Sequence, residues 1–375
     1  MIFFRNIPTV ILAFLGIFII VYLLLNGNKL QYMQVIINKK HILIIFLLFL
    51  FMLLSLLWSP IPERGAVSLL HMIATVFVFL IAFLGVSLFT YKNPSTSMVP
   101  CLILLLAALL ILFEMRFGSP VRSFFGGNPV SHRLNRGVVA TVLFLPLALY
   151  ALPRTRIAIM IGCIVSYSVA IAAFSSASES AKLALLILIF SIPLFYLGQK
   201  KLLYVFNIVC ISSLIFMPII AVYIHSLIPE FLSNRPYFGT IKIRADMWAE
   251  FSELIWLRPL LGQGMEASYV AQDIYGHLVT NAHVLGFGHT HNFAMQVWYE
   301  LGFVGVLLIS WLISLFIRSL KSLPTSATPW ILSTVSAFWA VSLVSHGAWQ
   351  AWWWSLMGIV TLLWIVFLRI DVSTQ

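Results

Sequence analysis

Charged residues are scarce in this sequence. Asp, Glu, Lys and Arg together make up 9% of its 375 residues, whereas soluble proteins carry roughly 25%. Hydrophobic residues make up 62%, and the mean hydropathy is +1.04. A soluble globule could not remove so much apolar surface from water, so lipid must solvate much of the chain. The composition therefore excludes a soluble domain and predicts an integral membrane protein.

Cysteine is scarcer still. The three cysteines, Cys101, Cys163 and Cys210, each lie inside an apolar run, and no CxxC pair occurs. A buried cysteine usually packs as a small hydrophobic side chain. The sequence thus offers neither a disulfide framework nor a cysteine-based metal site.

Acidic residues are half as frequent as basic ones, 11 against 22, and the formal charge is +11. A nucleic-acid-binding protein would gather its basic residues on a soluble face. Here they form short blocks between apolar runs, which is typical of membrane topology signals. We therefore expect membrane lipids as partners and no nucleic acid.

Long apolar runs divide the chain into membrane-spanning candidates. A spanning helix needs about 20 mostly apolar residues, and eleven runs approach that length. They predict an all-α fold, a polytopic transmembrane bundle of about 11–12 spans. The first run follows Arg5 but has no small-residue cleavage site, so we interpret it as an uncleaved helix rather than a signal peptide. The runs are residues 8–25, 41–58, 66–89, 99–115, 137–152, 157–174, 182–198, 203–224, 292–317, 330–346 and 350–368.

The basic residues also predict the orientation of the bundle. Eleven Lys and Arg residues but only one acid lie in 26–40, 90–98, 153–156, 199–202, 318–329 and the tail after residue 368. Positively charged loops stay in the cytoplasm, so we expect the N-terminus outside and the C-terminus inside. Segments 116–136, 175–181 and 225–291 would then share the outer face.

Segment 225–291 is the longest stretch between spans. It has 67 residues and holds five of the nine histidines. Its aromatic content and helical periodicity argue against disorder, and long ordered loops are usually functional. We therefore expect three parts: an N-terminal transmembrane bundle of about eight spans over 1–224, a partly helical periplasmic loop over 225–291, and C-terminal helices with a short cytoplasmic tail over 292–375.

A helix is predicted over residues 240–257, TIKIRADMWAEFSELIWL. At 100° per residue its acidic side chains share one face, while Arg244 lies on the opposite, apolar face with Trp248 and Phe251. An arginine on a buried stripe needs an anionic partner. The alternative is an arginine in the first turn that reaches to water.

The second candidate is GHTHN, residues 288–292, which runs directly into a predicted span. His291 would lie at the boundary of membrane and water, where a histidine that titrates near neutral pH suits general-base chemistry. A capping or interfacial histidine is the alternative. A metal site with His277, His283, His289 and His291 is a further one, but their spacing matches no standard zinc pattern.

Two more basic segments face the same side. Arg133 and Arg136 open the span at 137–152, where a helix N-terminus and a guanidinium suit a phosphate, although arginines there can also anchor lipid headgroups. Lys182 follows Glu179 by three residues, so the two charges could neutralise each other. Two or three cations beside one neutral base would suit a metal-free reaction on a lipid-linked diphosphate.

Several of these residues carry a family resemblance. HTHNFAMQVWYELGFVGVLL, residues 289–308, resembles the hallmark of the O-antigen ligase and polymerase superfamily, in which an HN…E-x-G-x-x-G pattern follows a large periplasmic loop. KIRADMW around Arg244, with RPLLGQG at 258–264, resembles the family's arginine and P…G.G element. NRG at 135–137 resembles the start of a middle helix. With the hydropathy profile, the resemblance covers residues 60–368.

The resemblance implies a membrane glycosyltransferase of the bacterial inner membrane that needs no metal and acts at the periplasmic face. It would transfer a glycan from undecaprenyl diphosphate to a lipid A–core sugar, in lipopolysaccharide biosynthesis, or to a second lipid-linked repeat unit in the polymerases. His291 would be the base and Arg244 a catalytic contact to the diphosphate. The substrate-binding residues would be Arg133, Arg136, Lys182, His289 and Asn292.

The chain departs from the family pattern at two points. Many members have Ser-Arg where this chain has Glu179 to Lys182, and lysine lacks the guanidinium fork. Ligases typically have twelve spans, and eleven are counted here. We favour ligase over polymerase.

Two rival classes remain. A transporter or lipid flippase would place ionisable residues in mid-membrane, and these spans have few. A structural scaffold would not explain the arginine at 244 or the histidine at 291. The tryptophans between 349 and 354 are expected to form an interfacial belt, with a role in holding lipid or sugar as the alternative.

Overall fold

The computed structural model describes residues 7–25, 39–88, 97–127, 134–228 and 239–372. Every regular element within these ranges is a helix, so the predicted all-α class is confirmed. The helices are α1 (Ile7–Leu25), α2 (Lys39–Ser55), α3 (Pro62–Leu88), α4 (Val99–Arg116), α5 (Pro120–Phe124), α6 (Asn135–Tyr150), α7 (Arg156–Ser175), α8 (Glu179–Gly198), α9 (Leu202–Ile215), α10 (Met217–Leu227), α11 (Gly239–Ile255), α12 (Ala271–Tyr275), α13 (Phe293–Ser319), α14 (Thr328–Val344) and α15 (Ala351–Val372).

Six of these helices, α3, α4, α7, α8, α13 and α15, are long and apolar enough to cross a membrane. A seventh span is possible if α9 and α10 count as one, but they are bent by 78° relative to each other. The chain is therefore a polytopic helical membrane protein. All eleven predicted runs are helical, but the expected count of eleven spans is not reached within the described residues, because α2, α6, α14 and the Ile7–Val21 part of α1 are shorter apolar helices.

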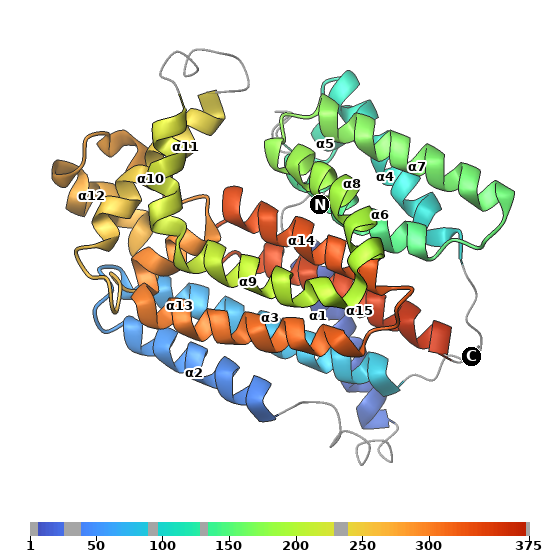
Figure 1. The fold of residues 1–375 in the computed structure, drawn as a ribbon, viewed down its shortest axis with the longest axis horizontal. Helices are drawn as coiled ribbons and strands as arrows, with labels where there is room; N and C mark the ends of the chain where they lie inside the picture. The colour runs from blue at the N-terminus through green and yellow to red at the C-terminus, as the bar shows by residue number, and fades with distance from the viewer. Residues whose placement is uncertain (1–6, 26–38, 89–96, 128–133, 229–238, 373–375) are drawn as a thin grey trace.

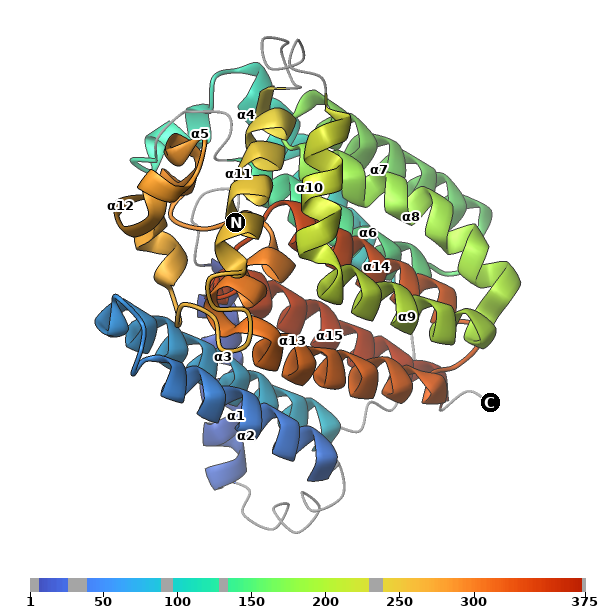
Figure 2. The same cartoon turned by 60° about the vertical axis from the view of Figure 1, so that its left-hand side comes forward.

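The helices pack in two groups that meet at α14 and α15 (Figures 1 and 2). In one group α8 lies along α14, and α6 contacts α4, α7 and α8. In the other, α13 packs against α2 and α9, and α3 packs against α1 and α15. Helices α11 and α12 gather at one end of the bundle, at the left in Figure 1. The N-terminus of α13 therefore begins beside residues of the expected long loop.

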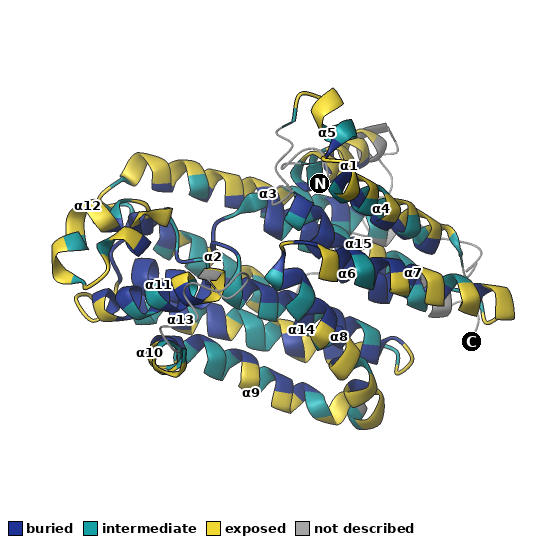
Figure 3. Ribbon diagram, turned by 90° about the horizontal axis from the view of Figure 1, so that it is seen from above, coloured by how far each residue is buried: buried dark blue, intermediate teal, exposed yellow. Residues whose placement is uncertain are grey.

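Large apolar side chains cover the outside of the helices. Phe14, Leu106 and Leu197 are 68%, 68% and 89% exposed, and exposed positions run along the outer helices in Figure 3. Such a surface would be unfavourable in water and is the one that a lipid-embedded bundle presents.

The bend between α9 and α10 replaces the single straight helix expected over 203–224. It occurs just before Pro218, which lacks an N–H and cannot continue the ladder of hydrogen bonds. Pro218 cannot donate to the Leu214 carbonyl, and Trp298 Nε1 of α13 donates to this oxygen instead at 2.9 Å. Ser252 Oγ of α11 donates to Pro218 O at 2.9 Å. Irregular backbone at membrane depth is tolerated where protein satisfies it in this way.

Candidate functional site

The candidate site lies at the N-terminus of α13. Asn292 is its N-cap, and its Oδ1 accepts from the Met295 N–H at 3.1 Å. The Thr290 hydroxyl donates to the Asn292 carbonyl at 2.7 Å. These bonds hold His291 with a φ of +49°, a conformation that is uncommon for residues other than glycine. Backbone strain of this kind is often found at functional sites, because the surroundings must enforce it.

Helix α11 brings Arg244 to the same place. Trp248 donates its indole N–H to the carbonyl of Thr290 at 2.9 Å, which fixes α11 against the residue before His291. Arg244 precedes Trp248 by one helical turn. The predicted apolar face is buried, since Trp248, Phe251 and Ile255 are 6%, 0% and 1% exposed. Within the described part of the chain, the Arg244 guanidinium forms no salt bridge.

The segment between α14 and α15 completes one wall of the site. The Ser345 carbonyl lies 3.2 Å from His291 Nδ1. The ring of His289 lies 4.0 Å from that of His291, and its Nδ1 accepts the His291 backbone N–H at 3.1 Å. His289 Nε2 lies 3.3 Å from the side-chain amide nitrogen of Gln350. Both histidines are thus oriented by neighbours rather than free to rotate.

The surroundings keep His291 uncharged. Burial lowers its pKa from 6.5 to about 4, the bond with Ser345 opposes this shift, and the positive charge of Arg244 adds to it. Burial also lowers the pKa of Arg244, and the Glu179 carboxylate opposes that change. Because arginine stays protonated at any physiological pH, the site pairs a fixed cation with a neutral imidazole.

Arg136, the second residue of α6, approaches from another direction. Its guanidinium carbon lies 4.8 Å from the centre of the Trp352 ring, a cation–π distance. Trp352 is itself 2% exposed and donates its indole N–H to Gln350 Oε1 at 3.0 Å. An apolar cavity of about 620 Å³ lies between α1, α4, α6 and α15, and Gly137 forms part of its wall.

The prediction that the tryptophans between 349 and 354 form a belt at the membrane surface is wrong for three of the four. Trp349, Trp352 and Trp353 are 7%, 2% and 1% exposed and lie inside the protein. Each of them donates its indole N–H to an internal acceptor, Glu300, Gln350 and Ser342 respectively. Buried indoles pack well where such a partner is within reach, so these residues build the core beside the site.

Lys182 differs from the arginines. Its ammonium lies 2.9 Å from the Glu179 carboxylate, with both side chains partly buried. The charge of Lys182 is therefore compensated at least in part by its own helix, as the i, i+3 spacing allowed. Arg133, the remaining predicted substrate-binding residue, lies outside the described residues.

Glu300 is a residue whose role the sequence did not reveal. Its side chain is fully buried in α13. The carboxyl group accepts hydrogen bonds from Glu266 N at 2.6 Å, Ser268 Oγ at 2.6 Å, Gln296 Nε2 at 2.9 Å and Trp349 Nε1 at 2.5 Å. These donors come from the loop after α11, from α13 and from the segment before α15. Glu300 thus joins the three segments that surround His291.

A close backbone crossing lies directly beneath Glu300. Gly302 has φ +59° and ψ −162°, which interrupts the helical geometry of α13. The 258–264 loop fills the break: Gln263 N donates to Tyr299 O at 2.8 Å and Phe303 N to Pro259 O at 2.8 Å. A Cβ on Gly262 would meet the Glu300 carbonyl at 2.5 Å, and one on Gly302 would meet the Leu260 carbonyl at 2.5 Å. Only glycine fits either position.

His346 is the second residue that sequence analysis missed. It follows Ser345 directly, is 8% exposed, and contacts the rings of Trp352 and Trp353. Its only sequence signal was its position at a break between two apolar runs.

Among the described residues, no group of three or more His, Cys, Asp or Glu residues could hold a metal ion.

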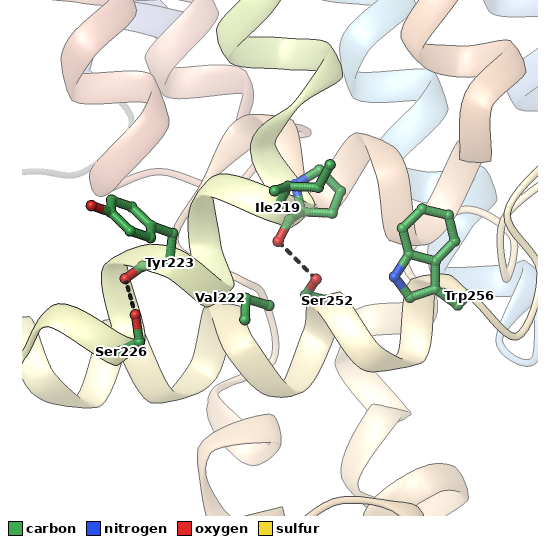
Figure 4. A pocket seen from close by; sticks show the side chains of 7 residues that line it. Ile219, Val222, Tyr223, Ser226, Ser252 and Trp256 are labelled. Carbon is green, nitrogen blue, oxygen red and sulfur yellow. Dashed lines mark hydrogen bonds between the residues drawn. The ribbon is translucent and has the colours of Figure 1, made fainter.

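A separate depression lies between α10 and α11. It encloses about 390 Å³ and is lined by Ile219, Val222, Tyr223, Ser252 and Trp256 among others (Figure 4). Its two serine hydroxyls are engaged: Ser226 Oγ donates to Tyr223 O at 2.8 Å, and Ser252 Oγ to Pro218 O. It shares no lining residue with the histidine and arginine cluster.

Comparison with known families gives a match to this region. Residues 163–310 match the O-antigen ligase family. The matched segment contains Arg244, His289, His291 and Glu300, so the resemblance noted in the sequence is confirmed. No solved structure matches the chain.

Two curated relatives are similar over a comparable length. A Rickettsia typhi protein named as a polysaccharide ligase is 27% identical over 176 residues, which cover 44% of this chain and 40% of that protein. A Rickettsia felis protein of the same name is 25% identical over 166 residues, 40% of this chain and 38% of the relative. The similarity therefore spans less than half of either relative.

Proposed function

We propose that this protein is a membrane glycosyltransferase of the O-antigen ligase type. In the proposed reaction, an acceptor hydroxyl oxygen attacks the anomeric carbon of a glycan linked to undecaprenyl diphosphate. The bond from that carbon to the diphosphate oxygen breaks, undecaprenyl diphosphate leaves, and the hydroxyl proton passes to His291. No redox partner is needed, and the charge that develops is negative and located on the diphosphate.

The observation that supports this proposal best is the approach of Arg244 to a neutral His291. A general base must be unprotonated before it accepts a proton, and the leaving diphosphate needs fixed positive charge. We assign Arg244 and Arg136 to the diphosphate, and the cavity beside Gly137 would suit its apolar chain. His289 and Asn292 act by orienting His291 and capping α13. Lys182, paired with Glu179, adds a weaker contact.

The first test removes the base. We expect His291→Ala to abolish glycan transfer in proteoliposomes supplied with the lipid-linked donor and an acceptor, while the protein still inserts and purifies normally. A matched variant, His71→Ala, changes an exposed histidine on α3 and should transfer at the wild-type rate. Undiminished transfer by His291→Ala would refute the base assignment.

The acceptor separates ligase from polymerase. We favour the lipid A–core acceptor, in the inner membrane with the site facing the periplasm. A deletion strain that loses glycan-capped lipopolysaccharide but keeps long undecaprenyl-linked chains would support a ligase. Lipopolysaccharide capped with single repeat units would instead identify a polymerase. A flippase would move the lipid across the bilayer without cleaving its glycosyl bond. It would therefore give no transferred glycan in the proteoliposome assay.

A further inference from the structure

His346 has a buried polar atom without a partner. The side chain lies between α14 and α15 and is 8% exposed, and its Nε2 forms no hydrogen bond within the described part of the chain. Leaving a buried donor or acceptor unsatisfied costs about 1–3 kcal/mol. Folded proteins rarely retain such an atom unless a bound water, an ion, a ligand or a functional role explains it.

Its neighbours connect His346 to the candidate site. Its ring centre lies 4.8 Å from that of Trp352 and 4.3 Å from that of Trp353. The Arg136 guanidinium also lies over the Trp352 ring. The preceding residue, Ser345, contacts His291 through its carbonyl. His346 and Arg136 thus contact the same indole, that of Trp352. His346 is also bonded directly to the residue whose carbonyl contacts His291.

The charges around His346 determine what it can bind. Burial lowers its pKa well below 6.5, and Arg136, His289, His291 and Arg244 lower it further. The imidazole is therefore neutral and carries one N–H donor. Among the described residues, the permanent charges that act on it are those of Arg136 and Arg244, so an anion is the ligand that this site would favour. Phosphate oxygens accept hydrogen bonds and do not donate them when ionised, so a ring N–H is the group that could meet one.

We propose that His346 is a further substrate-contacting side chain of the site, whose Nε2–H donates a hydrogen bond to an oxygen of the prenyl diphosphate. This proposal rests on the proposed function, because it names a contact to the same donor. Arg136 and Arg244 supply charge to the diphosphate, whereas His346 supplies a directional contact without adding a further positive charge near His291. The tryptophans on either side hold its ring in place.

The test measures binding without catalysis. The probe is undecaprenyl diphosphate without a glycan, titrated into the purified full-length protein in detergent and followed by tryptophan fluorescence. His346→Phe keeps the ring contacts with the tryptophans but removes the donor, so we expect its Kd to rise roughly ten-fold or more, as for a lost hydrogen bond to a charged group. His346→Gln retains a neutral donor and should recover most of the affinity. His71→Phe, at an exposed histidine of α3, should bind like the wild type.

The outcomes separate this contact from packing and from the proposed reaction. Wild-type affinity in His346→Phe would overturn the proposal, as would equal losses in both His346 variants that parallel a lower unfolding temperature. If the wild type binds the probe in a His346-dependent way but transfers no glycan, the proposed reaction fails and the binding site stands. If the wild type transfers glycan and His346→Phe does so with unchanged kcat/KM, only the His346 contact fails.

Discussion

His291 lies where its surroundings oppose protonation. Burial and the nearby Arg244 both disfavour a second positive charge. A diphosphate bound between the cations would reverse the electrostatic part, because its negative charge favours the imidazolium. The proton affinity of His291 would therefore rise when the donor binds, and the base would gain strength in the complex that uses it.

The first prediction at the residue scale concerns pH. An unperturbed histidine would lose base activity below about pH 6.5. His291, with a pKa of about 4, remains neutral until the pH falls through that value. We expect kcat/KM, which reports the free enzyme, to stay level from pH 7.5 to about 5 and to decline only below. A decline centred near pH 6.5 would show that His291 titrates normally or is not the base.

The second prediction at the residue scale concerns the shape of the cationic group at position 244. Arg244→Lys keeps the charge but loses the planar fork that binds two phosphate oxygens at once. We expect at least a ten-fold loss of kcat/KM in the proteoliposome assay, or about 1.4 kcal/mol of transition-state stabilisation. Arg258→Lys, an exposed arginine just after the same helix, serves as the matched control. Full activity in Arg244→Lys would show that a point charge is sufficient.

At the scale of elements, the interrupted helix α13 holds the site together. The break at Gly302 allows the 258–264 loop to pair with its backbone. Glu300, two residues earlier, then reaches the next part of that loop through Glu266 and Ser268. Glu266 in turn forms a salt bridge with Arg64 of α3 at 3.0 Å. Glu300 and Gly302 of the E-x-G pattern thus position the segments around His291.

This arrangement predicts a stability defect. Gly302→Ala forces an L-residue into a conformation that costs about 1–3 kcal/mol, and its Cβ would meet the Leu260 carbonyl at 2.5 Å. We expect a lower unfolding midpoint in detergent together with reduced transfer. Gly276→Ala is the control, because the φ of Gly276 is −56° and the nearest new contact is Ala282 Cβ at 3.3 Å. Equal midpoints for the two variants would contradict the role of the crossing.

At the scale of the whole molecule, the distribution of basic residues predicts the orientation in the membrane. Leu278→Cys lies on the expected outer side, and Lys321→Cys lies on the cytoplasmic side; both positions are exposed. In a Cys163→Ser background, which removes the exposed native thiol, a membrane-impermeant maleimide should label position 278 in cells with a permeabilised outer membrane. Position 321 should react only after lysis. The reverse pattern would place the site in the cytoplasm.

Much of the local structure could be predicted, because it depends on neighbours in sequence. The 3.6-residue periodicity of 240–257 predicted a helix with a buried face, and α11 has one. Sustained apolar runs predicted helices at all eleven positions. The burial of the tryptophans was missed, since residues 349–354 meet acceptors such as Glu300 and Ser342 that are distant in sequence.

The sequence by itself therefore determined that this protein lies in lipid, that it is helical, and which chemical types its candidate residues have, since composition and periodicity are local properties. The tertiary structure decided which of those residues meet. Trp248 binds the Thr290 carbonyl, Arg136 rests on Trp352, and Gly262 crosses Gly302 only because separate helices pack in one arrangement. The same packing lowers the pKa of His291, because desolvation and nearby charge depend on distances in space rather than along the chain.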